Sequence, residues 1–259
     1  MGSNMTNIVL ETQDLTIRFG GHVAVNNVSC KFEKGTLTSI VGPNGAGKTT
    51  YFNLISGQLP PSDGKVFLKG EEITNISTAD KTLKGLGRAF QLTNLFPRLT
   101  VLENVRLAVQ GKAQVGLNLI RMASTYKELI EKAEYYLEKC SLIDIKNEVA
   151  YHLSHGDQRK LEVAVLMALE PEVFMFDEPT AGMSVDDVPV ILDLIQEIKD
   201  TTDKTILLVE HKMDVIRSLS DRIIVLHNGT LMIDGQPEEV MASELVQEIY
   251  LGVEAKKDD

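Results

Sequence analysis

The chain has 259 residues, of which 43% are hydrophobic and 24% charged, and its formal net charge at pH 7 is −11. This length indicates one large domain, or one domain with a subdomain, and the hydrophobic fraction is ample for a core. So acidic a balance argues against nonspecific binding of nucleic acid or anionic lipid as the main activity. Because no stretch approaches eighteen consecutive apolar residues, we expect no transmembrane helix, and the N-terminal residues do not resemble a signal peptide.

The cysteines and the chain ends carry little further information. Cys30 and Cys140 lie far apart and form no C-x-x-C motif, so we expect buried or half-buried free thiols of a reducing compartment. We expect residues 2–4 to be an addition before a native start at Met5. The charged residues Glu254–Asp259 are expected to form a mobile tail.

The first elements are predicted to be antiparallel strands. Ile8–Phe19 alternates loosely and ends in two glycines, and His22–Val28 resumes the alternation, which indicates two strands around a tight turn. The segment Ser29–Gly35 follows, and its residues Glu33-Lys34-Gly35 are expected to form a turn before the next strand. Phe19, just before the first turn, either packs on the sheet or offers a stacking surface for a purine ring.

The stretch Gly42–Thr50 fits the pattern G-x-x-x-x-G-K-[ST]. An apolar run, Leu37–Val41, predicts a buried strand before it, and Thr49–Ser56 predicts a helix after it. The glycines let backbone N–H groups surround phosphate oxygens, and the helix adds its positive N-terminal end. The alternative is a glycine-rich turn with a chance lysine. We expect nucleotide to be bound here by Gly42, Pro43, Asn44, Gly45, Ala46, Gly47, Lys48, Thr49 and Thr50.

The middle of the chain changes from strands to helices. A turn cluster at Pro60–Gly64 and the predicted strands Lys65–Leu68 and Gly85–Phe90 precede Gln91. Val101–Val109 and Tyr126–Cys140 then show helical spacing. We therefore predict a helical subdomain, residues 92–153, inserted into an α/β core formed by residues 5–91 and 154–253.

A second candidate phosphate site lies in Leu153–Gln158. Ser154 is a good N-cap for a helix whose apolar body is Leu161–Leu169 and which ends before Pro171. Ser154, Gly156 and Gln158 would offer a hydroxyl, bare N–H groups and a positive helix end to phosphate. One chain cannot easily place both sites on one nucleotide, but a head-to-tail pair can. The alternative is an ordinary capped helix.

Two predicted buried strands end in side chains suited to phosphate chemistry. Val173–Phe176 leads into Asp177 and Glu178, and Thr205–Val209 leads into Glu210 and His211. Carboxyl ends of parallel strands meet at one edge of a sheet, so Asp177 can hold Mg²⁺ there. Glu178 is placed to activate water and His211 to contact the γ-phosphate. The alternatives are a solvated turn acid and a structural histidine.

The C-terminal part is predicted to alternate helices with a hairpin. Val188–Lys199 and Val215–Leu219 show helical spacing, and Asn228-Gly229 is a strong hairpin signal. It joins the predicted strands Arg222–Leu226 and Thr230–Ile233. Glu238–Tyr250 predicts a closing helix.

Together these motifs resemble the nucleotide-binding subunit of ATP-binding cassette (ABC) transporters, over nearly the whole chain and in the family's order. The resemblance implies an α/β fold: a P-loop NTPase (RecA-like) core, an N-terminal antiparallel β subdomain and an inserted α-helical subdomain. It implies ATP and Mg²⁺ as cofactors. The roles it implies are adenine stacking for Phe19, Walker A for Gly42–Thr49, the Q-loop for Gln91, the signature for Leu153–Gln158, Walker B for Val173–Asp177, the catalytic glutamate for Glu178 and the switch histidine for His211.

The resemblance extends these roles to metal and partners. It implies catalysis by Glu178, His211, Lys48 and Gln91, with Thr49, Gln91 and Asp177 around the metal. The partners it implies are integral membrane permease subunits, a second copy or a paralogous ATPase and, indirectly, a periplasmic solute-binding protein, but no nucleic acid. The chain would then lie at the cytoplasmic face of the inner or plasma membrane as a peripheral subunit.

The sequence departs from the family pattern in two motifs. His155 stands where the signature usually has glycine, and Asp157 adds an acid near the phosphate-facing turn. Ser184 stands where the D-loop usually ends in aspartate, which bears on the contact across a dimer.

Local features resemble the ATPases of branched-chain amino acid importers. They are Gly87–Gln91, Thr100–Asn104, Ala181–Met183 and Tyr250–Gly252. The ATPases of urea importers and of lipopolysaccharide export share much of this pattern. A soluble ABC ATPase acting as a scaffold in cofactor assembly is the rival from another class. A DNA-repair ABC protein is disfavoured because no long coiled-coil insertion occurs, and a kinase or GTPase is disfavoured by Leu153–Gln158.

Overall fold

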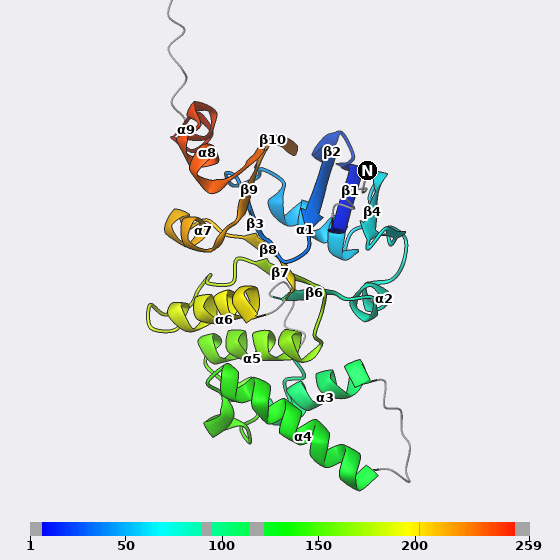
Figure 1. Cartoon of the computed structure of the whole chain (residues 1–259), viewed down its shortest axis with the longest axis vertical. Helices are drawn as coiled ribbons and strands as arrows, with labels where there is room; N and C mark the ends of the chain where they lie inside the picture. The colour runs from blue at the N-terminus through cyan, green and yellow to red at the C-terminus, as the bar shows by residue number, and fades with distance from the viewer. Residues whose placement is uncertain (1–6, 90–94, 114–121, 202, 252–259) are drawn as a thin grey trace, which may run out of the picture.

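The computed structural model describes residues 7–89, 95–113, 122–201 and 203–251. Figure 1 shows two sheets on either side of helix α1, with the remaining helices packed outside them. The strands are β1 (Ile8–Phe19), β2 (His22–Glu33), β3 (Leu37–Val41), β4 (Asp63–Leu68), β5 (Glu71–Glu72), β6 (Leu86–Ala89), β7 (Val173–Asp177), β8 (Thr205–Val209), β9 (Arg222–His227) and β10 (Thr230–Gly235). The helices are α1 (Lys48–Ser56), α2 (Thr78–Leu83), α3 (Val101–Ala113), α4 (Met122–Lys139), α5 (His155–Ala168), α6 (Val188–Thr201), α7 (Met213–Leu219), α8 (Pro237–Ala242) and α9 (Glu244–Leu251), with 3₁₀ turns at Ile143–Ile145 and Ala150–His152.

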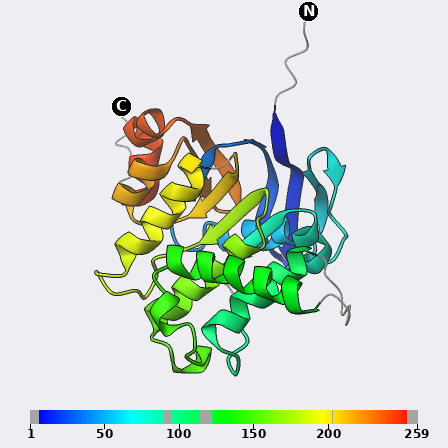
Figure 2. The same ribbon diagram turned by 60° about the horizontal axis from the view of Figure 1, so that its bottom comes forward.

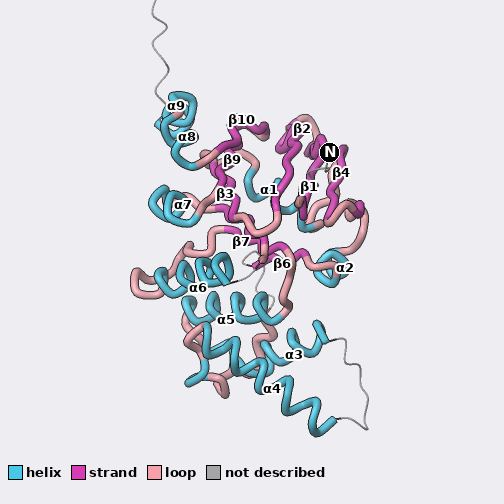
Figure 3. Tube along the Cα trace, in the orientation of Figure 1, coloured by secondary structure: helices cyan, strands magenta, loops and turns pink. Residues whose placement is uncertain are grey.

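The larger sheet carries the candidate site at one edge. Within the described ranges its strand order is β10-β9-β3-β8-β7-β6, and all neighbours pair in parallel except β10 with β9. Every residue of β3, β7 and β8 is buried, because helices cover both faces of the sheet. β3, β8 and β7 are adjacent and parallel, so the chain leaves all three at the same edge and the residues that follow them meet there. Figure 3 shows strands of this sheet, in magenta, between α1 and the helices α5 and α6.

The smaller sheet is antiparallel, in the order β2-β1-β4-β5 among the described strands. β2 continues to Glu33, past the strand end predicted at Val28: Cys30 pairs with Thr12 and Glu33 with Ile8, and the predicted turn follows at Lys34 and Gly35. The reason is that burial alternates through Val28, Cys30 and Phe32, the pattern of a half-buried strand.

Helix α1 lies between the two sheets. Tyr51, Phe52, Leu54 and Ile55 are fully buried and belong to one hydrophobic cluster with residues of both sheets. A helix that is apolar on several sides is stable only in such an enclosed position. At its other end Lys81 of α2, itself buried, donates from Nζ to the carbonyl oxygen of Ile55 at 3.1 Å.

Helices α3, α4 and α5 form the layer that comes forward in Figure 2. These three helices share one buried hydrophobic cluster with β7. The cluster includes Val105 of α3, Leu137 of α4 and Leu161 of α5, together with Phe174 and Phe176. The inserted subdomain predicted for residues 92–153 falls partly outside the described residues and stays a prediction about domain organisation.

The C-terminal prediction needs a correction. The single helix expected over Glu238–Tyr250 is instead α8 and α9, which Ser243 separates in an extended conformation. Serine competes with helical hydrogen bonds and favours helix ends. The predicted tail Glu254–Asp259 lies outside the described residues.

Two predictions from composition can be compared with the structure. Both cysteines are buried and free, as expected, and burial raises the pKa of Cys30 to about 11 and of Cys140 to about 12. Among the helices that the structure describes, none is both long and apolar enough to cross a membrane.

Candidate functional site

The Gly42–Thr50 loop leaves the N-terminal end of α1 open to an anion. α1 begins at Lys48, and its N-cap, Gly47, has φ 98°. A Cβ at Gly47 would lie 2.6 Å from the carbonyl oxygen of Ala24, so only glycine fits this close approach. No side chain caps this end and its first turn contains no acidic residue, so its N–H groups and its positive end remain available.

A cavity of about 310 Å³ lies over this helix end. Such a volume is at the small end of the range for small-molecule sites. The cavity brings the loop together with Glu178 and His211, as the sequence predicted. Its lining residues are His22, Ala24, Asn44, Gly45, Ala46, Gly47, Lys48, Thr49, Thr50, Glu178 and His211.

Phe19 lies at the end of β1 and is 50% exposed, but it does not line this cavity. His22, its partner across the hairpin, and Ala24 line it instead. Purine stacking by Phe19 stays a prediction, and Gln91 lies outside the described residues.

Lys48 is 6% exposed and its Nζ donates to the carbonyl oxygens of Gly42 and Pro43, at 2.7 and 3.0 Å. Burial lowers the pKa of Lys48, against the attraction of Glu178 and Asp177, which raises it. Among the described residues Lys48 hydrogen-bonds to carbonyl oxygens and forms no direct ion pair, so its charge is available to an anion.

Asp177 ends β7 and is 5% exposed. Its Oδ2 accepts a hydrogen bond from Nη2 of Arg88 at 2.7 Å, whereas its Oδ1 is buried and has no hydrogen-bond partner among the described residues. Burial raises the pKa of Asp177 although Arg88 opposes the shift. An orphaned buried carboxylate oxygen of this kind fits a hard cation such as Mg²⁺.

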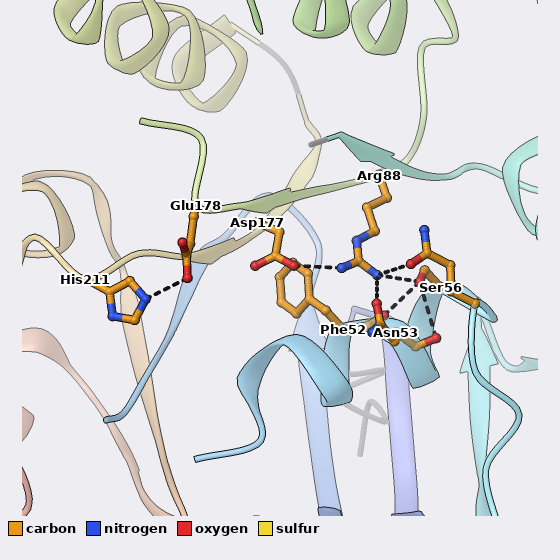
Figure 4. Close-up of polar contacts among 8 residues, drawn as sticks. Phe52, Asn53, Ser56, Arg88, Asp177, Glu178 and His211 are labelled. Carbon is orange, nitrogen blue, oxygen red and sulfur yellow. Dashed lines mark hydrogen bonds and ion pairs between the residues drawn. The ribbon is translucent and has the colours of Figure 1, made fainter. Parts of the chain in front are cut away.

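Glu178 and His211 contact each other beside Asp177 (Figure 4). Nε2 of His211 lies 2.7 Å from Oε1 of Glu178, and both side chains are about two-fifths exposed, 39% and 40%. Glu178 has φ 51°, a left-handed conformation rare for a residue with a side chain, while its N–H donates to the carbonyl oxygen of Val209.

Glu210 holds the turn that carries His211, a role that the sequence did not reveal. Its side chain is buried, accepts from Thr180 Oγ1 at 3.0 Å and accepts from the backbone N–H groups of His211 and Lys212 at 2.8 and 3.2 Å. These bonds fix the backbone on both sides of the imidazole.

The second candidate phosphate site is closed by its own side chains. Ser154 Oγ accepts from the N–H of Asp157 at 3.1 Å and donates to Asp157 Oδ2 at 2.8 Å, and Gln158 Nε2 donates to the carbonyl oxygen of Leu153. Neither Ser154 nor Gly156 nor Gln158 lines the cavity over α1. The predicted cap is confirmed, and phosphate binding at this site stays a prediction.

The start of α5 packs against the segment that precedes α6. A Cβ at Gly156 would lie 2.5 Å from Oδ2 of Asp187, so glycine is required here by close packing. Lys160 forms ion pairs with Oδ1 of Asp187 at 2.7 Å and Oδ1 of Asp157 at 3.3 Å. The side chain of His155 lies against Gly182.

Arg88 is the other residue that sequence reasoning missed. A signal was present, because an arginine within a short buried strand such as β6 needs a carboxylate nearby. The sequence alone did not say which carboxylate, since Asp177 lies 89 residues away in the chain.

The sequence profile of the family described as "ABC transporter" matches residues 25–181. The ATP-binding protein LivG of high-affinity branched-chain amino acid transport in Escherichia coli is 36% identical over 253 residues, which cover 96% of this chain and 99% of LivG. The corresponding BraF protein of Pseudomonas aeruginosa is 37% identical over 257 residues, covering 96% of this chain and 99% of BraF.

Solved structures give the same result. A nucleotide-free ATP-binding cassette from an ABC transporter superposes with a TM-score of 0.80 at 30% identity, over 95% of this chain and 100% of the other. A dimeric cassette in a post-hydrolysis state, bound to ADP and phosphate, has a TM-score of 0.77 at 26% identity and covers 88% of this chain and 98% of the other.

The fold and the Gly42–Thr50 loop define a P-loop ATPase of the cassette type. The chain belongs to the ABC transporter family, and its class is that of the ATP-hydrolysing transporter subunits. The predicted resemblance, fold class and enzymatic activity are thereby confirmed.

Proposed function

We propose that this chain is the ATP-hydrolysing subunit that powers import of branched-chain amino acids through separate membrane subunits. The observation that carries the substrate is the 36% identity, over 96% of the chain, to a protein named for high-affinity branched-chain amino acid transport. Similarity over the full length supports the same transport partners better than similarity in the nucleotide site does, because all ATP-binding cassettes bind ATP.

The residues of the cavity suit Mg²⁺ bound together with ATP. The Thr49 hydroxyl and the unpaired Oδ1 of Asp177 would hold the ion, and Gln91 is its further predicted ligand. Within the described residues no three acidic, histidine or cysteine side chains form a cage, which suits an ion that keeps phosphate and water ligands. The ion would neutralise charge on the β- and γ-phosphates.

The side chains of this chain then act by position and charge. Lys48 releases its bonds to Gly42 and Pro43 and binds phosphate oxygens, where its charge stabilises the transition state. Glu178 orients a water in line with the γ-phosphate and accepts its proton. His211 donates to Glu178, which keeps that carboxylate on the cavity side.

Two copies, or one copy and a paralogue, would complete the site. Ser154 and Gly156 do not line the cavity of their own chain, so they would reach the γ-phosphate bound by the other copy. A related cassette is known as a dimer with ADP and phosphate. Closure of the dimer on ATP would move the helical layer against membrane subunits at the cytoplasmic face, and hydrolysis would reopen it.

The test is to purify the protein from its native membranes in mild detergent and to identify the chains that accompany it. We expect integral membrane subunits, and the complex should hydrolyse ATP faster when a periplasmic binding protein loaded with leucine is added. Recovery with cytosolic partners only would contradict the transport role but leave the ATPase intact. Stimulation by a different solute would correct the substrate alone.

A further inference from the structure

Arg88 lies on β6, beside the strand that carries Asp177. The parallel register pairs Arg88 with Met175, and the side chains of Arg88 and Asp177 are 6% and 3% exposed. A guanidinium buried to this degree is tolerated only with a carboxylate and further acceptors, because it has lost its water.

The guanidinium joins two elements of the site (Figure 4). Nη2 donates to Oδ2 of Asp177 at 2.7 Å, and Nη1 donates to Oδ1 of Asn53 at 2.7 Å and to Oγ of Ser56 at 2.9 Å. Asn53 and Ser56 belong to α1, the helix that begins with Lys48. The planar fork of arginine makes these bonds in fixed directions, so it cannot rotate without breaking them.

The position of Arg88 is fixed on further sides. Its Cζ lies 5.5 Å from the centre of the Phe52 ring, and Nη1 donates to Oε1 of Gln58 at 3.2 Å. Arg88 is therefore held by α1 and by the turn after it, as well as by Asp177.

The two oxygens of Asp177 consequently differ. Oδ2 is bound to Arg88, whereas Oδ1 has no hydrogen-bond partner in the part of the chain that the structure describes. A carboxylate fixed through one oxygen presents the other in a constant direction. A hydrogen bond from outside the ligand sphere orients metal ligands in this way.

We propose that Arg88 is a positioning residue, which orients the Asp177 carboxylate for Mg²⁺ and fixes its distance from Thr49 through α1. This inference rests on the proposed binding of Mg·ATP. Two other roles of Arg88 give different results: a guanidinium that only neutralises Asp177 for folding, and one that competes with Mg²⁺ for the carboxylate.

The experiment compares Arg88→Lys, Asn53→Ala and the control Arg222→Lys. Lysine keeps the charge but loses the fork, and Asn53→Ala removes an anchor while leaving the pair with Asp177 intact. Arg222 is a matched control because it also pairs with an aspartate, Asp234, and lies 5.8 Å from a phenylalanine ring, Phe32, outside the cavity. The affinity for a fluorescent ATP analogue is measured in excess Mg²⁺ and in EDTA.

We expect Mg²⁺ to tighten binding of the ATP analogue by the wild type. In Arg88→Lys this tightening should be about tenfold smaller, which is the lower end of the losses seen when hydrogen-bond partners of metal ligands are removed. Its affinity in EDTA should stay within about twofold of wild type. Asn53→Ala should lose a smaller part of the gain, about threefold, and Arg222→Lys none. ATP hydrolysis titrated with Mg²⁺ should shift to higher concentration in the same order.

Several results would overturn the proposal. If Mg²⁺ tightens nucleotide binding by Arg88→Lys as much as in the wild type, or if affinity falls equally with and without Mg²⁺, Arg88 has a role in folding only. If Mg²⁺ tightens binding by Arg88→Lys more than in the wild type, Arg88 competes with the ion for Asp177. If Arg88→Lys does not fold, Asn53→Ala decides, and wild-type Mg²⁺ dependence there refutes positioning. A wild-type protein that binds no ATP analogue would refute the proposed nucleotide function instead.

Discussion

The N-terminal ends of α1 and α5 are both candidates for binding phosphate, and they differ in what occupies them. At α1 no side chain caps the helix and the first turn has no acid, while a buried lysine lies in the loop. At α5 Ser154 accepts a backbone N–H, and Asp157 and Asp187 lie close by. A positive helix end without acids attracts an anion, whereas acids at that position already stabilise the other helix. The first end can therefore bind phosphate by itself, whereas in the proposed dimer the second would bind a phosphate held by another copy.

Glu178→Gln should have the largest effect on ATP hydrolysis, because it removes the proposed proton acceptor from the cavity over α1 with little change in side-chain shape. We expect ATP hydrolysis to fall about 10²–10⁴-fold, the usual contribution of a general base, with ATP binding retained. Size-exclusion chromatography should show a dimer in the presence of ATP. Glu33→Gln, at the exposed end of β2, is the control and should hydrolyse normally. A mutant keeping more than about a tenth of the rate would rule out Glu178 as the base.

Lys48→Ala tests whether α1 is the primary phosphate end. It removes one charge-assisted contact, which is worth about 1.5–3 kcal/mol, so ATP affinity should fall roughly 10- to 100-fold. Isothermal titration calorimetry measures it, with Lys65→Ala, an exposed lysine of β4, as the control. Unchanged affinity would contradict the loop's assignment.

Gly156→Ala tests the close packing at the N-terminal end of α5. Its Cβ would lie 2.5 Å from Asp187, so the start of α5 or the Lys160–Asp187 pair must move. Overpacking of this kind costs about 1–3 kcal/mol in the free energy of unfolding. Gly111→Ala, in α3 with open space around it, should instead stabilise the protein by up to about 1 kcal/mol. Urea unfolding of both variants checks this, and equal stabilities would show that Asp187 yields freely.

The smallest expected effect is the contribution of Lys81, near the C-terminal end of α1, to the pH dependence of stability. Burial lowers the pKa of Lys81 from 10.5 to about 8, so between these values the unfolded chain binds more protons than the folded one. Stability should therefore rise with pH in this window, by about 1 kcal/mol between pH 8 and pH 9. Urea unfolding of the wild type against Lys81→Met measures the contribution, which is absent if both show the same slope.

Local patterns predicted most of the elements and the first site. The loop Gly42–Thr50 and the strand and helix on either side of it are contiguous in the sequence. Their structure therefore depends mainly on neighbouring residues, which local patterns can detect. The predicted boundaries of elements were wrong where a weak helix-ending signal was overlooked, as at Ser243, or where alternation continued past the predicted strand end, as in β2.

Contacts between distant residues could not be predicted in this way. The pair Arg88–Asp177 depends on the order of strands in the sheet, which sequence spacing does not contain. That Glu178 and His211 lie at one edge of the sheet was predicted, but their direct contact was not. The closure of Ser154 on Asp157 was equally hidden, because the same residues suit a cap and a phosphate site.

Cross-linking across a dimer tests the central claim most directly. One copy carries Asn44→Cys in the loop and the other Ser154→Cys, both with Glu178→Gln, and they are mixed with Mg·ATP and a short bismaleimide. The two native cysteines are buried, which shields them from the reagent, and burial raises the pKa of both thiols. The account predicts a cross-linked dimer in the mixture that requires ATP and that neither variant forms alone. A mixture that stays monomeric with ATP bound, or cross-links equally well without ATP, would contradict a site shared between two copies.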